Sequence, residues 1–117
     1  MKSGSEPGES RDLFRGALEM MILHALRRQP SHGYALVQHI RRTSNDLLQV
    51  EEGSLYPALQ RLLKAGLVKS RWETSATGRR VRTYEVTARG AKHLDREISS
   101  FEQMLEGITR VLAPVKP

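Results

Sequence analysis

Side chains with hydrogen-bonding ends recur on one face of a predicted helix in the middle of the chain. Residues 51–66 read EEGSLYPALQRLLKAG, in which leucines repeat at helical spacing and so form a stripe suited to burial. The opposite face is polar, basic and hydroxyl-bearing, and it carries Ser54, Tyr56, Gln60, Arg61 and Lys64. Glutamine suits the edge of adenine and arginine that of guanine, while hydroxyl groups and cations can bind phosphate. This face therefore has the chemistry of a helix that contacts the major groove of DNA.

Proline and glycine set the expected limits of this helix. Pro57 lacks a backbone N–H and fits a helix best in its first turn, so the helix is predicted to start at residues 53–55. Ser54 is the predicted N-cap, and Gly66 is predicted to end the helix. The recognition helix is accordingly assigned to residues 54–65.

A cluster of arginines follows this helix. The formal net charge of the chain is +6, and residues 61–92 alone contain nine basic and two acidic residues. Period-two alternation predicts two strands here, joined by a hairpin tip. The predicted wing, residues 74–82, contains Arg79, Arg80 and Arg82. We expect them to contact a phosphate backbone or enter a narrow minor groove; the alternative is a solvated loop whose charge serves solubility.

Another predicted helix begins within the sequence SHGY. This helix is expected over residues 32–43, with Ser31 as its cap. Free N–H groups at a helix N-terminus can bind an anion, so Ser31 and His32 are candidate phosphate contacts. The alternative is a simple capped turn, and Tyr34 is expected to lie in the core.

The order of these elements predicts the fold. Two helices joined by a turn and followed by a hairpin are typical of a winged helix-turn-helix domain. We therefore predict a mostly α protein with a small β-hairpin. The predicted parts are a disordered N-terminal arm at residues 1–11, a winged helix-turn-helix domain at 12–87 whose first helix spans 12–28, and a C-terminal dimerisation helix at 88–113.

Apolar residues form a heptad pattern in the last predicted helix. Their spacing alternates between four and three residues, as in the seam of a coiled coil. They are Leu94, Ile98, Phe101, Leu105, Ile108 and Leu112. The first helix is apolar around most of its circumference and also needs a partner surface. We therefore favour homodimerisation, the alternative being that the seam packs on the chain's own core.

The residue types that many enzymes and metal sites need are missing or scattered. The chain has no cysteine, which excludes disulfides, thiol catalysis and Cys-based zinc sites. Its four histidines lack metal-ligand spacing, and no catalytic or cofactor-binding motif is found. No enzyme activity, catalytic residue, metal site or cofactor is therefore predicted. No apolar run reaches the ~20 residues that cross a bilayer and no secretory signal is found, so a cytoplasmic protein without a membrane partner is expected.

One tryptophan, Trp72, lies in the first predicted strand. We expect it to pack on a strand face, because most lone aromatic residues belong to a core. The alternative is that Trp72 stacks on a planar apolar ligand near a dimer groove.

Three segments together resemble the PadR family of bacterial transcriptional regulators. They are PSHGYAL at residues 30–36, EEGSLYPALQRLLKAGLV at 51–68 and GRRVRTYEVTARG at 78–90. The short C-terminal helix is similar to that of the smaller branch of the family, which has a single dimerising helix. The resemblance implies a winged-helix homodimer that represses by binding a palindromic operator in double-stranded DNA through the recognition helix and wing.

Some members of this family release DNA when a phenolic acid or hydrophobic drug binds near the dimer interface. The sequence has no clear signature of such an effector site. Two other interpretations therefore stay open: a regulator that senses a small hydrophobic effector, and a winged-helix protein-interaction module without DNA specificity.

Overall fold

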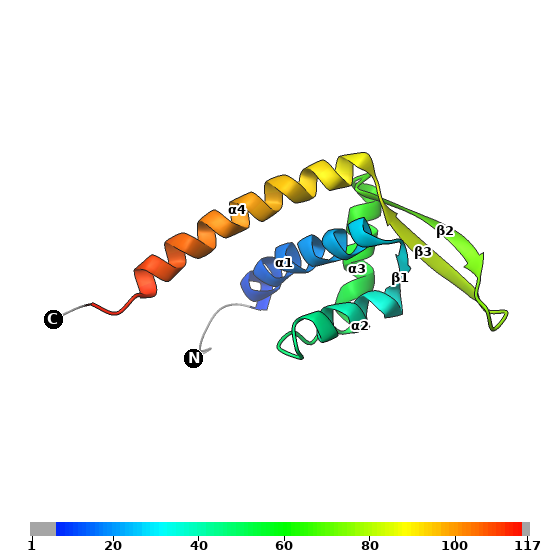
Figure 1. Cartoon of the computed structure of the whole chain (residues 1–117), viewed down its shortest axis with the longest axis horizontal. Coiled ribbons are helices and arrows are strands. Elements are labelled where there is room, and N and C mark those ends of the chain that lie inside the picture. The colour runs from blue at the N-terminus through cyan, green and yellow to red at the C-terminus, as the bar shows by residue number, and fades with distance from the viewer. Residues whose placement is uncertain (1–6, 116–117) are drawn as a thin grey trace.

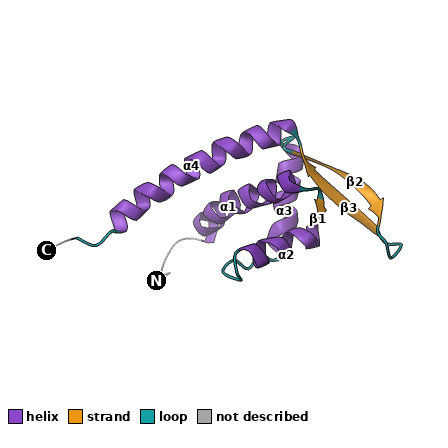
Figure 2. Cartoon of the chain, in the orientation of Figure 1, coloured by secondary structure: helices purple, strands orange, loops and turns teal. Residues whose placement is uncertain are grey.

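The structure is a bundle of four helices with a small three-stranded antiparallel sheet at one end (Figures 1 and 2). The computed structural model describes residues 7–115, with side chains described from Gly16 onward. The elements are α1 (Pro7–Arg28), β1 (Ser31–His32), α2 (Gly33–Thr43), α3 (Glu52–Lys64), β2 (Val68–Thr74), β3 (Arg80–Val86) and α4 (Ala88–Leu112). The predicted winged helix-turn-helix architecture is confirmed.

The core forms where the apolar stripes of the helices meet. Each helix contributes side chains that are almost completely buried, with Val68 and Tyr84 added from the sheet. The most deeply buried are Leu18, Ile22, Leu23, Leu26, Leu36, Leu55, Leu59, Leu62 and Leu94. Burial of each such side chain contributes about 1.5–3 kcal/mol, and this packing fixes α3 against α1 and α2. The leucine stripe of α3 is thus the buried face that its spacing predicts.

The helix α3 begins earlier than predicted. Its N-cap residue is Glu51, which makes no side-chain cap hydrogen bond, and Ser54 lies inside the helix. Pro57 is consequently in the second turn, where it removes one backbone hydrogen bond rather than none. The predicted end is confirmed: Gly66 has φ +75°, and the N–H of Leu67 donates to the carbonyl of Leu62 in a Schellman arrangement.

The starts of α1 and α2 also differ from the predictions. Pro7 begins α1, so residues 7–11 of the expected disordered arm are helical, and the rest of that arm lies outside the described residues. Ser31 does not cap α2, because it belongs to β1, and its hydroxyl donates to the carbonyl of Gln29. A two-residue strand gives no periodicity signal. It pairs with β3 at Tyr84 and so attaches the start of α2 to the hairpin.

The last helix, α4, spans the predicted residues. Its N-cap is Thr87, whose Oγ1 accepts a hydrogen bond from the N–H of Gly90 at 3.0 Å. An ion pair of 2.7 Å between Arg27 and Asp95 joins α4 to α1. The C-terminal end of α4 extends past the rest of the bundle, on the side opposite to the hairpin (Figure 1). None of the helices between residues 7 and 115 combines the length and apolarity needed to cross a bilayer.

Candidate nucleic-acid interface

The hairpin of β2 and β3 has two chemically different faces. Residues directly opposite each other on paired strands point to the same side of a sheet, and the side alternates along each strand. One set of pairs consists of Ser70 with Tyr84, Trp72 with Arg82 and Thr74 with Arg80. The neighbouring set consists of Lys69 with Glu85, Arg71 with Thr83 and Glu73 with Val81. We name the first set the aromatic face and the second the paired face.

On the aromatic face, guanidinium groups lie over aromatic rings. The Cζ atom of Arg80 is 4.8 Å from the centroid of the Trp72 ring. That of Arg82 is 5.8 Å from the Trp72 centroid and 5.7 Å from the Tyr84 centroid. Arg82 also donates from Nε to the hydroxyl of Ser70 at 2.9 Å. No carboxylate of the described residues pairs with Arg80 or Arg82, so their charge is available to an anion.

On the paired face, carboxylates neutralise the arginine. Arg71 donates from Nε to Glu73 at 2.7 Å and from a terminal nitrogen to Glu85 at 2.9 Å. The hydroxyl of Thr83 donates to the other oxygen of Glu73. The hydrogen bonds from Arg71 and Thr83 lower the pKa of the Glu73 carboxyl. The free positive charge of the hairpin is therefore concentrated on the aromatic face.

A hollow of about 480 Å³ separates the aromatic face from the starts of α2 and α3. The residues that line it are His32, Gly33, Tyr34, Tyr56, Trp72, Arg79, Arg80, Val81, Arg82 and Tyr84. Three phenol groups and three guanidinium groups thus surround one space. Hydroxyl donors and arginines are the groups that commonly contact DNA phosphates.

The position of the Tyr56 ring depends on the absence of a side chain at Gly33. A Cβ atom at Gly33 would lie 2.7 Å from the Tyr56 hydroxyl oxygen, which is too close for any other residue without movement of the ring. Burial, helped by Glu52 and Tyr84, raises the pKa of Tyr56 above its usual value of 10. The phenol therefore stays protonated at neutral pH and can donate a hydrogen bond.

The exposed side of α3 carries most of the predicted recognition residues. Ser54, Tyr56, Gln60 and Lys64 are all exposed, next to the hollow or farther along the helix. Arg61 is different, because its Nε donates to Glu19 of α1 in an ion pair in which both side chains are less than one-third exposed. The prediction that Arg61 contacts a base edge is therefore not supported, since the arginine holds α3 to α1.

The structure brings most of the other predicted DNA-contacting residues together. Arg79, Arg80, Arg82 and His32 line the hollow, whereas Ser31 does not, and its hydroxyl donates to the carbonyl of Gln29.

Two aromatic residues that the sequence places in the core line the hollow instead. Tyr34 and Trp72 are 56% and 57% exposed, so the expectation of core packing is wrong for both. Arg80 and Arg82 are two residues apart, so they point to the same face of their strand. This spacing indicates a basic face from the sequence alone, but only the register of the hairpin shows that Trp72 lies opposite Arg82 on that face.

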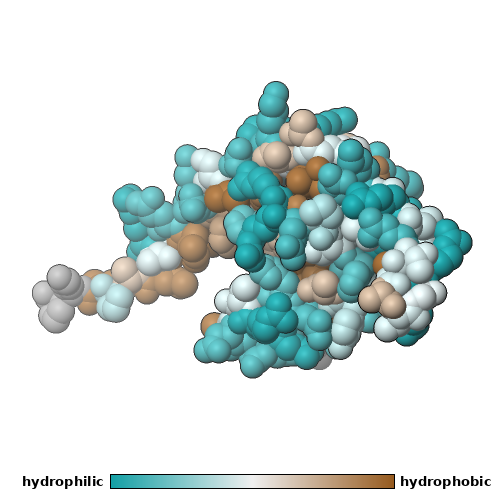
Figure 3. Space-filling model, turned by 45° about the vertical axis from the view of Figure 1, so that its right-hand side comes forward, coloured by the Kyte–Doolittle hydropathy of each residue, from teal (hydrophilic) through white to brown (hydrophobic). Residues whose placement is uncertain are grey.

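The heptad residues of α4 divide into two groups. Leu94 is completely buried in the chain's own core, and Ile98 packs against that core, so the prediction of a dimer role for Leu94 is wrong. The later ones, Phe101, Leu105, Ile108 and Leu112, are 37–74% exposed. Together with Met104 and Val111 they form an apolar strip along the projecting part of α4 (Figure 3).

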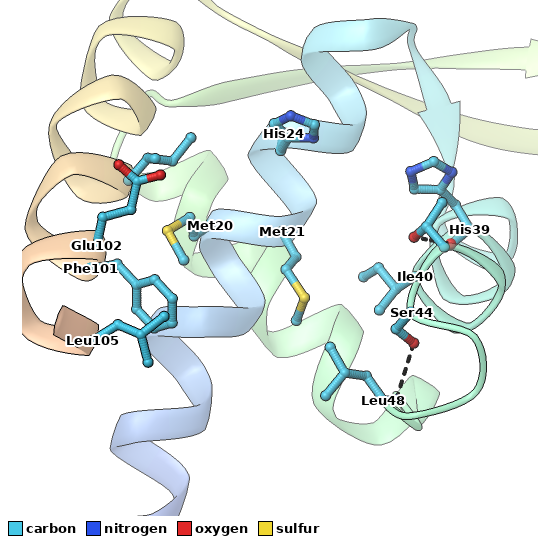
Figure 4. Close-up of a pocket in the computed structure, with 12 residues that line it drawn as sticks. Met20, Met21, His24, His39, Ile40, Ser44, Leu48, Phe101, Glu102 and Leu105 are labelled. Carbon is cyan, nitrogen blue, oxygen red and sulfur yellow. Dashed lines mark hydrogen bonds between the residues drawn. The ribbon is translucent and has the colours of Figure 1, made fainter. Parts of the chain in front are cut away.

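This strip continues into a groove over α1. The groove encloses about 440 Å³, with Met20, Met21 and His24 of α1 between residues of α4 and α2 (Figure 4). Phe101 and Leu105 form the α4 side, while Ile40 and Leu48 lie on the other side. The described residues contain no cluster of metal-ligating side chains, here or elsewhere.

The chain is similar to known proteins over most of its length. Residues 22–96 match the family described as "Transcriptional regulator PadR-like family". The transcriptional regulator Rv3488 of Mycobacterium tuberculosis is 32% identical over 94 residues, which cover 80% of this chain and 84% of that protein. A solved transcriptional regulator from Clostridium thermocellum is 29% identical with a TM-score of 0.79, over 87% of this chain and 96% of that one. A PadR family transcriptional regulator from Eggerthella lenta is 28% identical with a TM-score of 0.76, over 92% of each chain. The match in sequence and in fold shows that this chain belongs to the PadR-like family of transcriptional regulators.

Proposed function

We propose that this regulator is a homodimer that binds a palindromic DNA operator in a sequence-specific manner and represses transcription by occupying it. The observation that carries the proposal is the position of the unneutralised aromatic face of the hairpin beside the exposed polar side of α3. One surface can then contact both the edges of bases and the phosphate backbone. Phosphate contacts supply affinity and base contacts supply specificity.

Each group of side chains has its own role in this proposal. Gln60 hydrogen-bonds to a base edge in the major groove, where its amide suits adenine. Ser54, Tyr56 and Lys64 contact phosphate or sugar beside it. Arg79, Arg80 and Arg82, with His32, hold the backbone next to the hairpin or reach the adjacent minor groove. Arg61 is left out because it is engaged by Glu19.

A second copy of the chain is the proposed cover for the apolar strip of α4. Six large apolar side chains on a projecting helix are costly to leave in water, since each buried methylene contributes about 0.8 kcal/mol. The groove over α1 is lined mainly by apolar side chains, and it adjoins the strip through Phe101 and Leu105. A two-fold dimer built in this way presents two copies of α3 to successive major grooves, about 34–36 Å apart.

The experiment that tests this function is selection from a random-sequence duplex pool by the purified full chain at near-physiological salt, followed by sequencing. The proposal predicts enrichment of a two-fold symmetric sequence. Salt-sensitive binding without enrichment would instead indicate a winged-helix module that lacks DNA specificity. Repeating the selection with a variant of Gln60 separates base recognition from simple charge attraction.

A further inference from the structure

We propose that Trp72 is a positioning residue for DNA binding, whose ring holds Arg80 and Arg82 in place for phosphate without neutralising them. This inference deepens the proposed function and rests on it. It concerns a residue that the helical face and the arginine cluster do not include. Trp72 would act through the two arginines and not by a contact of its own with the bases.

The geometry is a ladder in which cations and rings alternate along one face of the hairpin. Arg80 lies 4.8 Å from the Trp72 centroid, and Arg82 lies between Trp72 at 5.8 Å and Tyr84 at 5.7 Å. All three distances are within the ~6 Å at which a cation is attracted to the face of an aromatic ring. The hydrogen bond from Arg82 to Ser70 fixes the middle of the ladder.

Trp72 adds little to the hydrophobic core. Its side chain is 57% exposed, whereas Tyr84 on the same face is only 5% exposed. A large aromatic residue this exposed near the end of a hairpin is not explained by packing with the helices. The contacts that its ring makes on this face are with the guanidinium groups of Arg80 and Arg82.

The two faces of the hairpin show two ways to hold an arginine. On the paired face, Glu73 and Glu85 hold Arg71, but they also cancel its charge and occupy its N–H donors. A ring face attracts the cation through its quadrupole and leaves both the charge and the in-plane N–H groups free. Arginines held by Trp72 therefore remain able to bind phosphate, and binding to DNA costs them less conformational freedom.

The test measures DNA affinity for a set of variants in a double-mutant cycle. The variants are Trp72→Leu, Trp72→Phe, Arg80→Ala with Arg82→Ala, and that pair combined with Trp72→Leu. The probes are a labelled duplex carrying the selected sequence and a random-sequence duplex. Thermal melting of each variant checks the fold, which should persist because Trp72 is largely exposed.

We expect Trp72→Leu to weaken binding of the proposed dimer to both duplexes by at least about tenfold, because two arginines in each chain would then lose conformational freedom on binding, and each such loss corresponds to about two- to twelvefold. Trp72→Phe keeps a ring face and should restore most of this affinity. In the chain that lacks both arginines, Trp72→Leu should cause no further weakening. The emission of Trp72, the only tryptophan, should also change when the arginines are removed in the absence of DNA.

Two results would overturn the inference while leaving the proposed function intact. One is unchanged affinity of Trp72→Leu for DNA that the unaltered chain binds well. The other is an equal decrease in affinity with and without the arginines, which would mean that the ring contacts DNA directly. Failure of the unaltered chain to bind any duplex would overturn the proposed function and this inference together.

Discussion

Arg61 on α3 donates a hydrogen bond from Nε to Glu19 on α1, across 42 residues of sequence. The helix that carries the candidate recognition residues is therefore fastened to the first helix by an ion pair that is largely screened from solvent. The same arginine lies on the polar face of α3 when that helix is considered alone. Its partner, and not its position on the helix, determines its role.

This pairing predicts that Arg61→Ala lowers stability and leaves base preference unchanged. We expect the free energy of unfolding to fall by about 1–2 kcal/mol, because Glu19 then keeps a half-buried charge without a partner. Urea unfolding measures the decrease, and selection from the random pool measures preference. A variant of normal stability with relaxed preference at a guanine position would return Arg61 to the base-contacting residues.

Gln60→Ala tests direct readout on the exposed side of α3. The affinity for the selected sequence should fall by about 1–3 kcal/mol, while binding to random duplex stays close to that of the unaltered chain. Competition between the two duplexes measures this difference. Gln103→Ala, an exposed glutamine on α4, is the matched control. Equal specificity in the Gln60 and Gln103 variants would remove Gln60 from the base contacts.

Gly33→Ala tests the position of Tyr56. The new methyl group would lie 2.7–2.9 Å from the Tyr56 ring and hydroxyl, so the ring must shift from its present position at the hollow. DNA affinity should fall several-fold, and the melting temperature should hardly change because alanine suits the first turn of a helix. Tight binding by this variant would show that the phenol is not needed. Gly90→Ala is the contrasting variant, in which the clash is with the backbone. The new Cβ would lie 2.0 Å from the carbonyl oxygen of Leu67, so this substitution should unfold the chain.

Leu105→Asp tests the proposed dimer interface. Leu105 is half exposed in the single chain, so the monomer should tolerate aspartate, but the buried charge should prevent association. Sedimentation velocity should show a dimer for the unaltered chain and a monomer for the variant. Gln103→Asp adds the same charge on the opposite side of α4 and should remain dimeric. A dimeric Leu105 variant would place the interface elsewhere.

The parts of the fold that repeat with a regular period were predictable from the sequence. Leucine spacing located α3, and heptad spacing located α4. Contacts between distant segments were not predictable in the same way. Leu94 and Leu105 both belong to the heptad seam, yet Leu94 is buried in the core, whereas Leu105 lines the open groove over α1 and is half exposed.

The candidate site shows the same limit. The arginine cluster of the hairpin was evident from residue types, and the structure places Arg79, Arg80 and Arg82 at the hollow. Trp72 could not be assigned to this site, because its place opposite Arg82 depends on the strand register. Pro57 shows that a local preference can yield to packing: α3 extends one turn before it, since the helix is held by its buried leucines.

The most direct test of the central claim is the salt dependence of DNA binding for Arg80→Ala and Arg71→Ala. Both variants remove one arginine from the same hairpin, but only Arg80 has a free charge in this structure. Removal of one phosphate contact lowers the slope of log affinity against log salt by about 0.9. For a dimer, Arg80→Ala should therefore reduce the slope by about two, and Arg71→Ala should leave it unchanged. Equal slopes for Arg80→Ala and the unaltered chain, or a reduction by Arg71→Ala alone, would contradict the assignment of the aromatic face to DNA.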